Sequence, residues 1–333
     1  MSSMPVVSII ICTRNRADSL RDTLASMARL RVPEDMPAEL LVVDNGSTDL
    51  TRQVVEEARL PDLPLRYVFE QSPGLSRARN RGMAESRGTI FLWTDDDCRV
   101  AEEWIEGMCR PILRGEADVV AGSIAIAPHL HRPWMTRLHL DWLVHQPAAH
   151  EVKDHQYLVG ANMAFHRRVA EATGGFDAEL GSGACGYADD TLMGWKALQA
   201  GFRIIGSPAR VEHHFDPCRL SRRHWLRDAL KRGASIAYVD YHWRHRAAPS
   251  RWRVLYSVLS YIKRYLLHPG WLLWKEGAAE GQLHALWDVG YWSRLYAEAS
   301  RPRRYDRLGL RPREPAGPET ATSGQPAPGN EQS

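Results

Sequence analysis

Three consecutive aspartates, Asp95, Asp96 and Asp97, directly follow an apolar run at residues 89–94. In an open α/β sheet ligands bind beyond the carboxyl ends of the strands, so the cluster stands where a site is expected. Adjacent carboxylates repel one another, and a bound Mg²⁺ or Mn²⁺ relieves that repulsion and can bridge to phosphate oxygens. Strand alternation directs Asp95 and Asp97 to the same side of the chain. The sequence therefore predicts that these two carboxylates share a divalent cation.

Two other interpretations of the aspartate cluster stay open. It can be a solvated acidic turn without a function. It can also belong to an enzyme that forms an aspartyl-phosphate and resembles the haloacid dehalogenases, in which a strand ends in Asp-x-Asp. Such enzymes usually carry Thr or Val two residues after the motif, where this chain has Arg99. The second alternative is therefore the weaker one.

The elements that must position the cluster alternate along the first two thirds of the chain. Short runs of aliphatic and β-branched residues, which predict buried strands, lie at residues 6–12, 40–44, 65–69 and 89–94. Between the first two runs, Leu20, Leu24 and Met27 recur at helical spacing. Further helices are predicted over 76–87 and 102–114. This alternation predicts an open, mostly parallel α/β sheet with flanking helices.

The overall composition is that of an ordinary globular protein. The chain has 333 residues, 44% hydrophobic and 25% charged, and its formal net charge of +3 favours no particular partner. Its cysteines lie far apart and form no Cys-x-x-Cys pair, which disfavours a disulfide framework or a zinc ribbon. The N-terminus lacks the features of a signal peptide, and no run approaches the roughly 18 apolar residues that span a bilayer. We therefore expect a cytoplasmic protein.

From about residue 220 to about residue 304 the pattern changes to helices rich in Trp, Tyr and Arg. Because Lys and Arg far outnumber acids between Arg219 and Arg253, residues 219–270 suit peripheral contact with the inner face of the cell membrane. Interleaved Arg and Trp side chains can also grip single-stranded nucleic acid by stacking and charge. Nothing else in the sequence favours nucleic acid as a partner, and we expect none. Residues 311–333 hold no aliphatic side chain larger than Ala. They predict a disordered tail, which we expect to begin at residue 305.

One predicted helix of this region carries two apolar stripes. They are formed by Leu255, Leu259, Ile262 and Leu266, and by Val254, Val258, Tyr261 and Tyr265. A helix that is apolar on so many sides is more often packed into a protein than laid on lipid. We therefore expect core packing, with membrane contact as the alternative.

Five blocks of the sequence resemble the family 2 glycosyltransferases, a large inverting group with the GT-A fold. They arrive in the family's order and cover most of residues 5 to 215, and VVDNGSTD is the most specific stretch. The blocks lie at residues 7–16, 40–49, 72–100, 160–181 and 188–204. The resemblance implies a Rossmann-like GT-A domain over 5–218, followed by the helical extension over 219–304 and the tail over 305–333.

The same resemblance implies a nucleotide-sugar donor and assigns residues to it. Thr13 and Asp44 would contact the nucleotide base, with Asp44 accepting a ring N–H. Asp95 and Asp96 would lie near the ribose and the phosphates. The helix that opens near Ser76 would face the donor through Arg77 or Arg79.

A divalent cation, Mg²⁺ or Mn²⁺, is implied as the cofactor. Asp97 would be its ligand in the Asp-x-Asp motif, together with Asp95. His213 follows the last block in a register that suits a metal or phosphate ligand, although a structural histidine is an equal alternative. The cation would bridge the two phosphates of the donor and stabilise the charge that develops on the departing diphosphate.

Catalysis is assigned by the resemblance to the pair Asp189-Asp190. Asp190 aligns with the general base, which would take the proton of the acceptor hydroxyl as that hydroxyl attacks the sugar. Asp189 stands where most members carry Glu, so the acceptor geometry differs. A pair stabilised by a helix N-terminus is the structural alternative. Residues 160–162 and 174–177 would line the sugar and acceptor side.

The predicted activity is thus transfer, with inversion, of a sugar from a nucleotide-diphosphate-sugar to a hydroxyl of a saccharide or lipid-linked acceptor. A sugar-nucleotide pyrophosphorylase is one alternative, but it would carry a Gly-rich loop where this chain has Thr13-Arg14-Asn15-Arg16. A catalytically inactive scaffold of the same fold is another alternative, which the presence of Asp97 and Asp190 disfavours.

Overall fold

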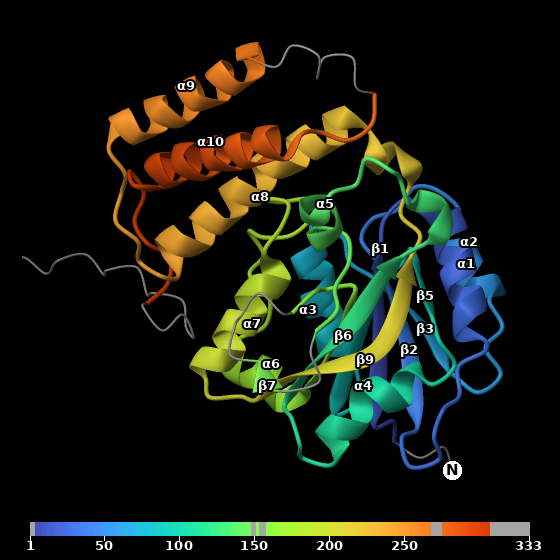
Figure 1. The fold of residues 1–333 in the computed structure, drawn as a ribbon. Coiled ribbons are helices and arrows are strands. Elements are labelled where there is room, and N and C mark those ends of the chain that lie inside the picture. Colours follow the sequence, from blue (N-terminus) through green and yellow to red (C-terminus); the bar gives the residue numbers. More distant parts are fainter. Residues whose placement is uncertain (1–3, 148–150, 153–157, 268–274, 307–333) are drawn as a thin grey trace, which may run out of the picture.

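The computed structural model describes residues 4–147, 151–152, 158–267 and 275–306. Within these residues, nine strands form one sheet in the order β3-β2-β1-β4-β8-β6-β9-β5, with β7 paired to β9. The strands are β1 (Val7–Thr13), β2 (Ala38–Asp44), β3 (Leu65–Phe69), β4 (Ile90–Asp95), β5 (Cys98–Val100), β6 (Val119–Ile126), β7 (Glu151–Val152), β8 (Asn162–His166) and β9 (Ile204–His213). The predicted α/β fold is confirmed (Figure 1).

The first half of the sheet is parallel. Strands β3, β2, β1 and β4 lie side by side, with Thr13 opposite Asp44 and Cys12 opposite Asp95. Their carboxyl ends therefore meet at one edge of the sheet, which is where open α/β sheets bind ligands. The four apolar runs found in the sequence are these four strands.

The second half of the sheet is mixed. Strand β8 runs antiparallel to both β4 and β6, whereas β6 and β9 are parallel. The short strand β5, which follows the aspartate cluster, pairs antiparallel with the end of β9 and sets Cys98 opposite His213. This pairing brings a histidine that is 116 positions later in the chain (213 − 97) beside Asp97.

Helices cover both faces of the sheet because successive strand side chains alternate between two hydrophobic cores. One core joins Ile9 and Ile11 to α1 (Ala17–Met27), α2 (Thr51–Glu57) and α4 (Trp104–Leu113). The other joins Ile10 to α3 (Leu75–Glu85), α6 (Arg167–Thr173) and α7 (Asp189–Gln199). Leu20, Leu24 and Met27 of α1 are buried in the first core, as their spacing predicts.

After β9 the chain continues through the predicted helical region. This region contains α8 (Arg222–His242), α9 (Arg251–Leu267) and α10 (Glu280–Glu298), which lie beyond the carboxyl edge of the sheet (Figure 1). The short helix α5 (Arg137–Asp141), from an earlier part of the chain, lies at the same edge. Helix α10 packs against both α8 and α9. A Cβ added to Gly233 would lie 2.0 Å from the carbonyl oxygen of Trp287, and one added to Gly290 would lie 2.1 Å from that of Leu230. Only glycine permits α8 and α10 to approach this closely.

The described helices include none that is both long and apolar enough to cross a membrane. The predicted disordered tail, residues 305–333, lies outside the described residues except for Tyr305 and Asp306. Tyr305 stacks on Trp243 at the end of α8, with the ring centroids 3.8 Å apart. The chain therefore remains packed against the helical region to at least this residue.

A buried joint connects the helical region to the sheet domain. Asp177, in the loop between α6 and α7, accepts hydrogen bonds from the Tyr238 hydroxyl (3.0 Å) and from Nε1 of Trp243 (2.9 Å). Lys196 of α7 donates to the carbonyl of Gly175 (2.7 Å) and lies over the Trp243 ring. Burial lowers the pKa of Lys196 to about 8. All these polar groups are paired, as buried polar groups must be.

Candidate functional site

The loops that follow β1, β2 and β3 are tied into one rim by hydrogen bonds. The backbone of Asn15 is in the left-handed region, at φ 53°. Its side-chain oxygen accepts from the backbone N–H of Thr48, and its backbone N–H donates to the Ser47 hydroxyl. Asn45 donates to two carbonyls of the third loop and accepts from the N–H of Gly74, which opens α3. The polar residues of the VVDNGSTD block therefore fix the shape of the edge, which explains why that stretch is rich in Asn, Ser, Thr and Asp.

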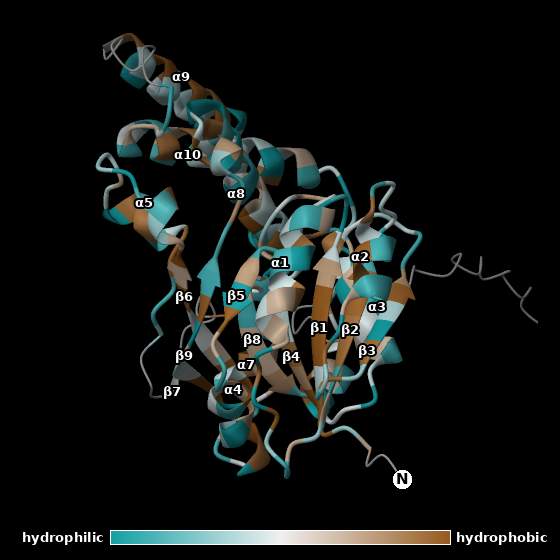
Figure 2. Ribbon diagram, turned by 90° about the vertical axis from the view of Figure 1, so that its right-hand side faces the viewer, coloured by the Kyte–Doolittle hydropathy of each residue, from teal (hydrophilic) through white to brown (hydrophobic). Residues whose placement is uncertain are grey.

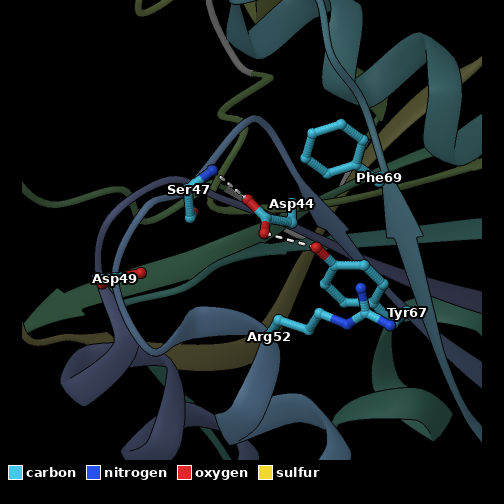
Figure 3. Close-up of a pocket in the computed structure, with 6 residues that line it drawn as sticks. All are labelled: Asp44, Ser47, Asp49, Arg52, Tyr67 and Phe69. Carbon is cyan, nitrogen blue, oxygen red and sulfur yellow. Dashed lines mark hydrogen bonds between the residues drawn. The ribbon is translucent and has the colours of Figure 1, made fainter.

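A pocket opens at this edge between β2, β3 and α2 (Figure 3). It is lined by Asp44, Ser47, Asp49, Arg52, Tyr67 and Phe69. The Tyr67 hydroxyl donates to one carboxylate oxygen of Asp44 (2.7 Å), and the Ser47 N–H donates to the other (2.8 Å). Burial raises the pKa of Tyr67 to about 12, so the phenol keeps its proton at neutral pH. The pocket thus presents the Asp44 carboxylate at the hydroxyl of Tyr67, whose ring lies against the Arg52 guanidinium, 5.5 Å from the centroid.

Of the two residues assigned to the nucleotide base, the structure places only Asp44 in this pocket. The side chain of Thr13 is buried and donates instead to Asp96 (2.7 Å). The aromatic lining was missed by the sequence reasoning. Tyr67 and Phe69 are two residues apart on a strand next to β2, so alternation could have indicated that they share a face.

The aspartate cluster is the turn between β4 and β5. Strand β4 ends at Asp95, and Asp96 and Asp97 form the turn. The Arg16 guanidinium bridges the two turn carboxylates, at 2.8 Å from Asp96 and 2.6 Å from Asp97. The Asp95 side chain is 36% exposed, whereas those of Asp96 and Asp97 are 4% and 2% exposed. Asp95 is thus the member of the cluster that solvent reaches.

Strand alternation does not extend across this turn, so the prediction that Asp95 and Asp97 point the same way loses its basis. Asp95 lies 3.8 Å from Arg79. Asp97 contacts Arg16 and lies 3.2 Å from Nε2 of His213. The structure therefore brings together Asp97 and His213, two of the three predicted metal ligands, and gives Asp95 a different partner.

Burial and neighbouring charges act in opposite directions on the turn carboxylates. Burial raises the pKa of Asp96 to about 7 despite the nearby Arg16. Burial also opposes ionisation of Asp97, but His213 and Arg16 outweigh it and hold the pKa of Asp97 well below its ordinary value. Asp97 is therefore the carboxylate of this pair that stays charged at neutral pH.

The turn has the chemistry of a cation site without the geometry of a preformed one. The Oδ1 atom of Asp97 is buried and accepts no hydrogen bond from the described residues, although His213 is close. Carboxylate oxygen and imidazole nitrogen both suit Mn²⁺, and carboxylate oxygen suits Mg²⁺. Within the part of the chain that the structure describes, no group of three His, Cys, Asp or Glu side chains is arranged to hold a metal. The residues fit a divalent cation at Oδ1 of Asp97, and Arg16, which holds Oδ2 of the same carboxylate, would have to move only if the cation took both oxygens.

Arg79 of α3 is the link between the turn and the second aspartate pair. Its guanidinium is ion-paired with Asp189, lies 3.8 Å from Asp95 and is only 4% exposed. It also lies over the Phe176 ring, 5.3 Å from the centroid. Arg77, by contrast, is exposed on α3. The sequence did not decide whether Arg77 or Arg79 faces the site. In the structure it is Arg79 that lies beside the aspartates.

Asp189 and Asp190 open helix α7 and point to different surroundings. Ala188 before them is in the left-handed region, at φ 70°, a conformation that costs free energy for a residue other than glycine and is often found at functional sites. Asp189 is buried against Arg79, and burial raises its pKa to about 6. Asp190 is half-buried and accepts hydrogen bonds from the N–H groups of Gly160 (2.9 Å) and Thr191 (2.7 Å).

Two residues expected on the sugar and acceptor side lie in the interior. Asn162 is fully buried, where its amide donates to the carbonyls of Ser123 and Ala209 and accepts from Nε1 of Trp104. Asp177 is bonded to α8, as described above. Both side chains are therefore engaged by buried polar groups of the protein, and neither is directed to the sugar and acceptor side.

The amino-acid sequence was compared with known proteins. Residues 8–174, about half the chain, match the model of glycosyl transferase family 2. The glycosyltransferase AglE of Haloferax volcanii is 32% identical over 124 residues, which are 37% of this chain and 40% of AglE. The probable glycosyltransferase YdaM of Bacillus subtilis is 26% identical over 227 residues, which are 65% of this chain and 52% of YdaM. The chain thus spans about half the length of these curated relatives, or less.

Solved structures share the fold. The mannosyltransferase PcManGT of Pyrobaculum calidifontis, solved in complex with GDP-Man and Mn²⁺, superposes with a TM-score of 0.52. The two chains are 22% identical, and the match covers 90% of this chain and 77% of that one. At this identity the likeness establishes the architecture and not the activity.

Proposed function

Since the chain belongs to glycosyl transferase family 2, we propose that it transfers a sugar from a nucleotide-diphosphate-sugar to an acceptor hydroxyl. One observation carries the proposal. A pocket lined by Asp44 and two aromatic side chains, the contact of Asp97 with His213, and the half-buried Asp190 all lie at the carboxyl edge of the parallel strands. A nucleotide, a metal-bound diphosphate and an acceptor hydroxyl are the groups that such features bind.

The nucleotide base would occupy the pocket at Asp44. The carboxylate can accept a ring N–H, and the Tyr67 and Phe69 rings offer apolar surface beside it. The Tyr67 hydroxyl and the Ser47 N–H each occupy one lone pair of a carboxylate oxygen, which leaves others for the ligand. Thr13 would act through Asp96 instead of touching the base.

The diphosphate would lie at the turn, on the exposed side of Asp95. Asp97 and His213, with Asp95, would hold Mg²⁺ or Mn²⁺. When bound, that cation supplies the positive charge that stabilises the departing diphosphate. PcManGT, the structural relative solved with Mn²⁺ and GDP-Man, supports this assignment for the shared fold. Arg16 would neutralise Asp96 throughout, because it holds Oδ2 of Asp97 and leaves Oδ1 to the cation.

Asp190 would be the general base. It is more accessible than Asp189, no ion pair joins it to a cation among the described residues, and the N–H groups of Gly160 and Thr191 fix its orientation. Removal of the acceptor proton by Asp190 as the hydroxyl attacks from the face opposite the diphosphate gives inversion at the anomeric carbon. Asp189 would be a positioning residue, whose ion pair with Arg79 fixes the start of α7.

The proposal is tested by thermal unfolding of the full chain with UDP, GDP or dTDP and Mn²⁺. We expect one nucleoside diphosphate to raise the unfolding temperature, and Mn²⁺ to increase that effect. Asp97→Ala should remove the contribution of Mn²⁺ and keep that of the nucleotide, whereas Asp44→Ala should remove both. Glu116→Ala, which changes a surface carboxylate, is the control. A wild-type protein that ignores every nucleotide, with or without the metal, would refute the function.

A further inference from the structure

Helix α9 has an inner and an outer apolar face. The inner face consists of Val254, Val258, Tyr261 and Tyr265, which are half-buried, and of the buried Ser257. Helix α10 packs against α9. Of the two stripes in the sequence, this one is therefore partly packed against the protein. The expectation of core packing holds for this stripe.

The outer face is exposed, which corrects the expectation for the other stripe. It is formed by Trp252, Leu255, Tyr256, Leu259, Ile262 and Leu266, and each of these side chains is between 44% and 69% exposed. At 100° per residue they cover about one third of the helix circumference. Figures 1 and 2 show α9 on the outside of the helical region, with α10 between it and α8. Lys263 is the one charged side chain of the helix that falls within this arc. A largely apolar face of this kind marks a surface that another phase or molecule covers.

The charges on α9 narrow the choice of what covers it. Arg251, Arg253, Lys263 and Arg264 are all exposed, and the helix contains no acid. Cations beside apolar side chains suit a surface that is anionic outside and apolar within. Trp252 and Tyr256 carry a polar group on an apolar ring, and such side chains favour the interface between water and lipid.

The same charges argue against self-association through this face. In a two-fold dimer the same surface of both copies meets, so the α9 cations of one copy would approach those of the other. The helix offers no carboxylate to neutralise them, and like charges in contact disfavour a pair. An anionic bilayer has the opposite charge and meets no such penalty.

We propose that the outer face of α9 docks the protein on an anionic membrane surface. The broader expectation of contact through residues 219–270 is thereby narrowed to one helix. Trp225 and Tyr238 of α8 are buried in the protein and are not available to lipid. The helix lies in the plane of the headgroups, with its leucines in the acyl region and its cations among the phosphates.

Flotation of the full chain with vesicles tests this proposal. We expect the protein to float with vesicles of phosphatidylcholine and phosphatidylglycerol, to bind less at high salt, and to bind much less to phosphatidylcholine alone. Leu259→Glu/Leu266→Glu should reduce binding roughly tenfold or more, because charges replace two exposed leucines that would otherwise insert into the acyl region of the bilayer. Lys263→Gln/Arg264→Gln should reduce binding to the anionic vesicles only. Leu113→Glu alters an exposed leucine at the end of α4 and should bind as the wild type does.

Circular dichroism and thermal unfolding establish that the variants fold, which we expect because the changed side chains are exposed. Two results would overturn the proposal. One is wild-type protein that stays unbound with both kinds of vesicle. The other is a dimer, measured by light scattering without lipid, that Leu259→Glu/Leu266→Glu converts to a monomer, since the face would then be a subunit interface.

Discussion

The two aspartate pairs at the sheet edge show two ways in which an arginine accommodates adjacent buried or half-buried carboxylates. At the turn, Arg16 bridges Asp96 and Asp97, and its side chain is 36% exposed. At the start of α7, the buried Arg79 pairs with Asp189, but no ion pair in the described residues joins it to the half-buried Asp190. A half-exposed arginine can give way to another cation, whereas a buried one is fixed by the cost of leaving its partner uncompensated. The turn pair is therefore suited to accept another cation in place of Arg16. In the pair at α7, Asp189 is fixed in an ion pair while Asp190 remains accessible.

The largest effect is expected for Asp190, the accessible carboxylate of the second pair. Asp190→Asn keeps the size of the side chain and an oxygen that can accept from the Gly160 N–H, but it loses basicity. We expect turnover to fall about 10²–10⁴-fold, with nucleotide binding unchanged in thermal unfolding. Release of the nucleoside diphosphate from the donor sugar measures turnover. Undiminished release would mean that the base lies elsewhere.

The next largest effect is expected on stability, for the buried Arg79. Arg79→Met removes the partner of Asp189 and a neighbour of Asp95, so a buried carboxylate loses its counter-charge. We expect the free energy of unfolding to fall by about 3–5 kcal/mol, as measured by urea denaturation. Arg77→Met on the same helix is the matched control and should change it by about 0.5 kcal/mol or less. Equal effects of the two substitutions would contradict the assignment of a buried ion pair.

The smallest effect is expected for Arg16, the partly exposed arginine of the turn. Arg16→Gln should lower the free energy of unfolding by about 1 kcal/mol, since the pair is partly exposed. In the presence of the nucleoside diphosphate, it should also lower the Mn²⁺ concentration at half-maximal stabilisation by about fivefold. The reason is that the positive charge of Arg16 on Oδ2 of Asp97 opposes a cation at Oδ1 of the same carboxylate. If the Mn²⁺ midpoint is unchanged or higher, Arg16 does not compete with the metal.

Local sequence signals were sufficient for the first half of the sheet and its edge. The aliphatic runs are β1 to β4, and a parallel sheet necessarily gathers the ends of those strands, so Asp44 and Asp95 fall at one edge. The spacing of Leu20, Leu24 and Met27 likewise determines which face of α1 is buried. These features depend on periods of two and 3.6 residues, which can be counted in the chain.

Features that depend on contacts between distant segments could not be read in this way. Helical spacing gives Arg77 and Arg79 similar opportunities, and only the packing of α3 against the loop that precedes α7 decides between them. His213 reaches Asp97 because β5 pairs with β9. Both stripes of α9 are apolar, and the wholly aliphatic one is the stripe left exposed, so the sequence could not tell which of them α10 would cover.

The buried joint at Asp177 has a consequence for how the protein can be divided. Its carboxylate takes hydrogen bonds from Tyr238 and Trp243, both of which lie beyond the boundary at residue 218 that the sequence suggests. A fragment that stops there would leave an anion in the interior with neither donor, next to the loop that leads into Asp189 and Asp190. The helices after β9 thus help to hold the loop that leads into α7, and we expect truncation at that boundary to disturb the proposed site.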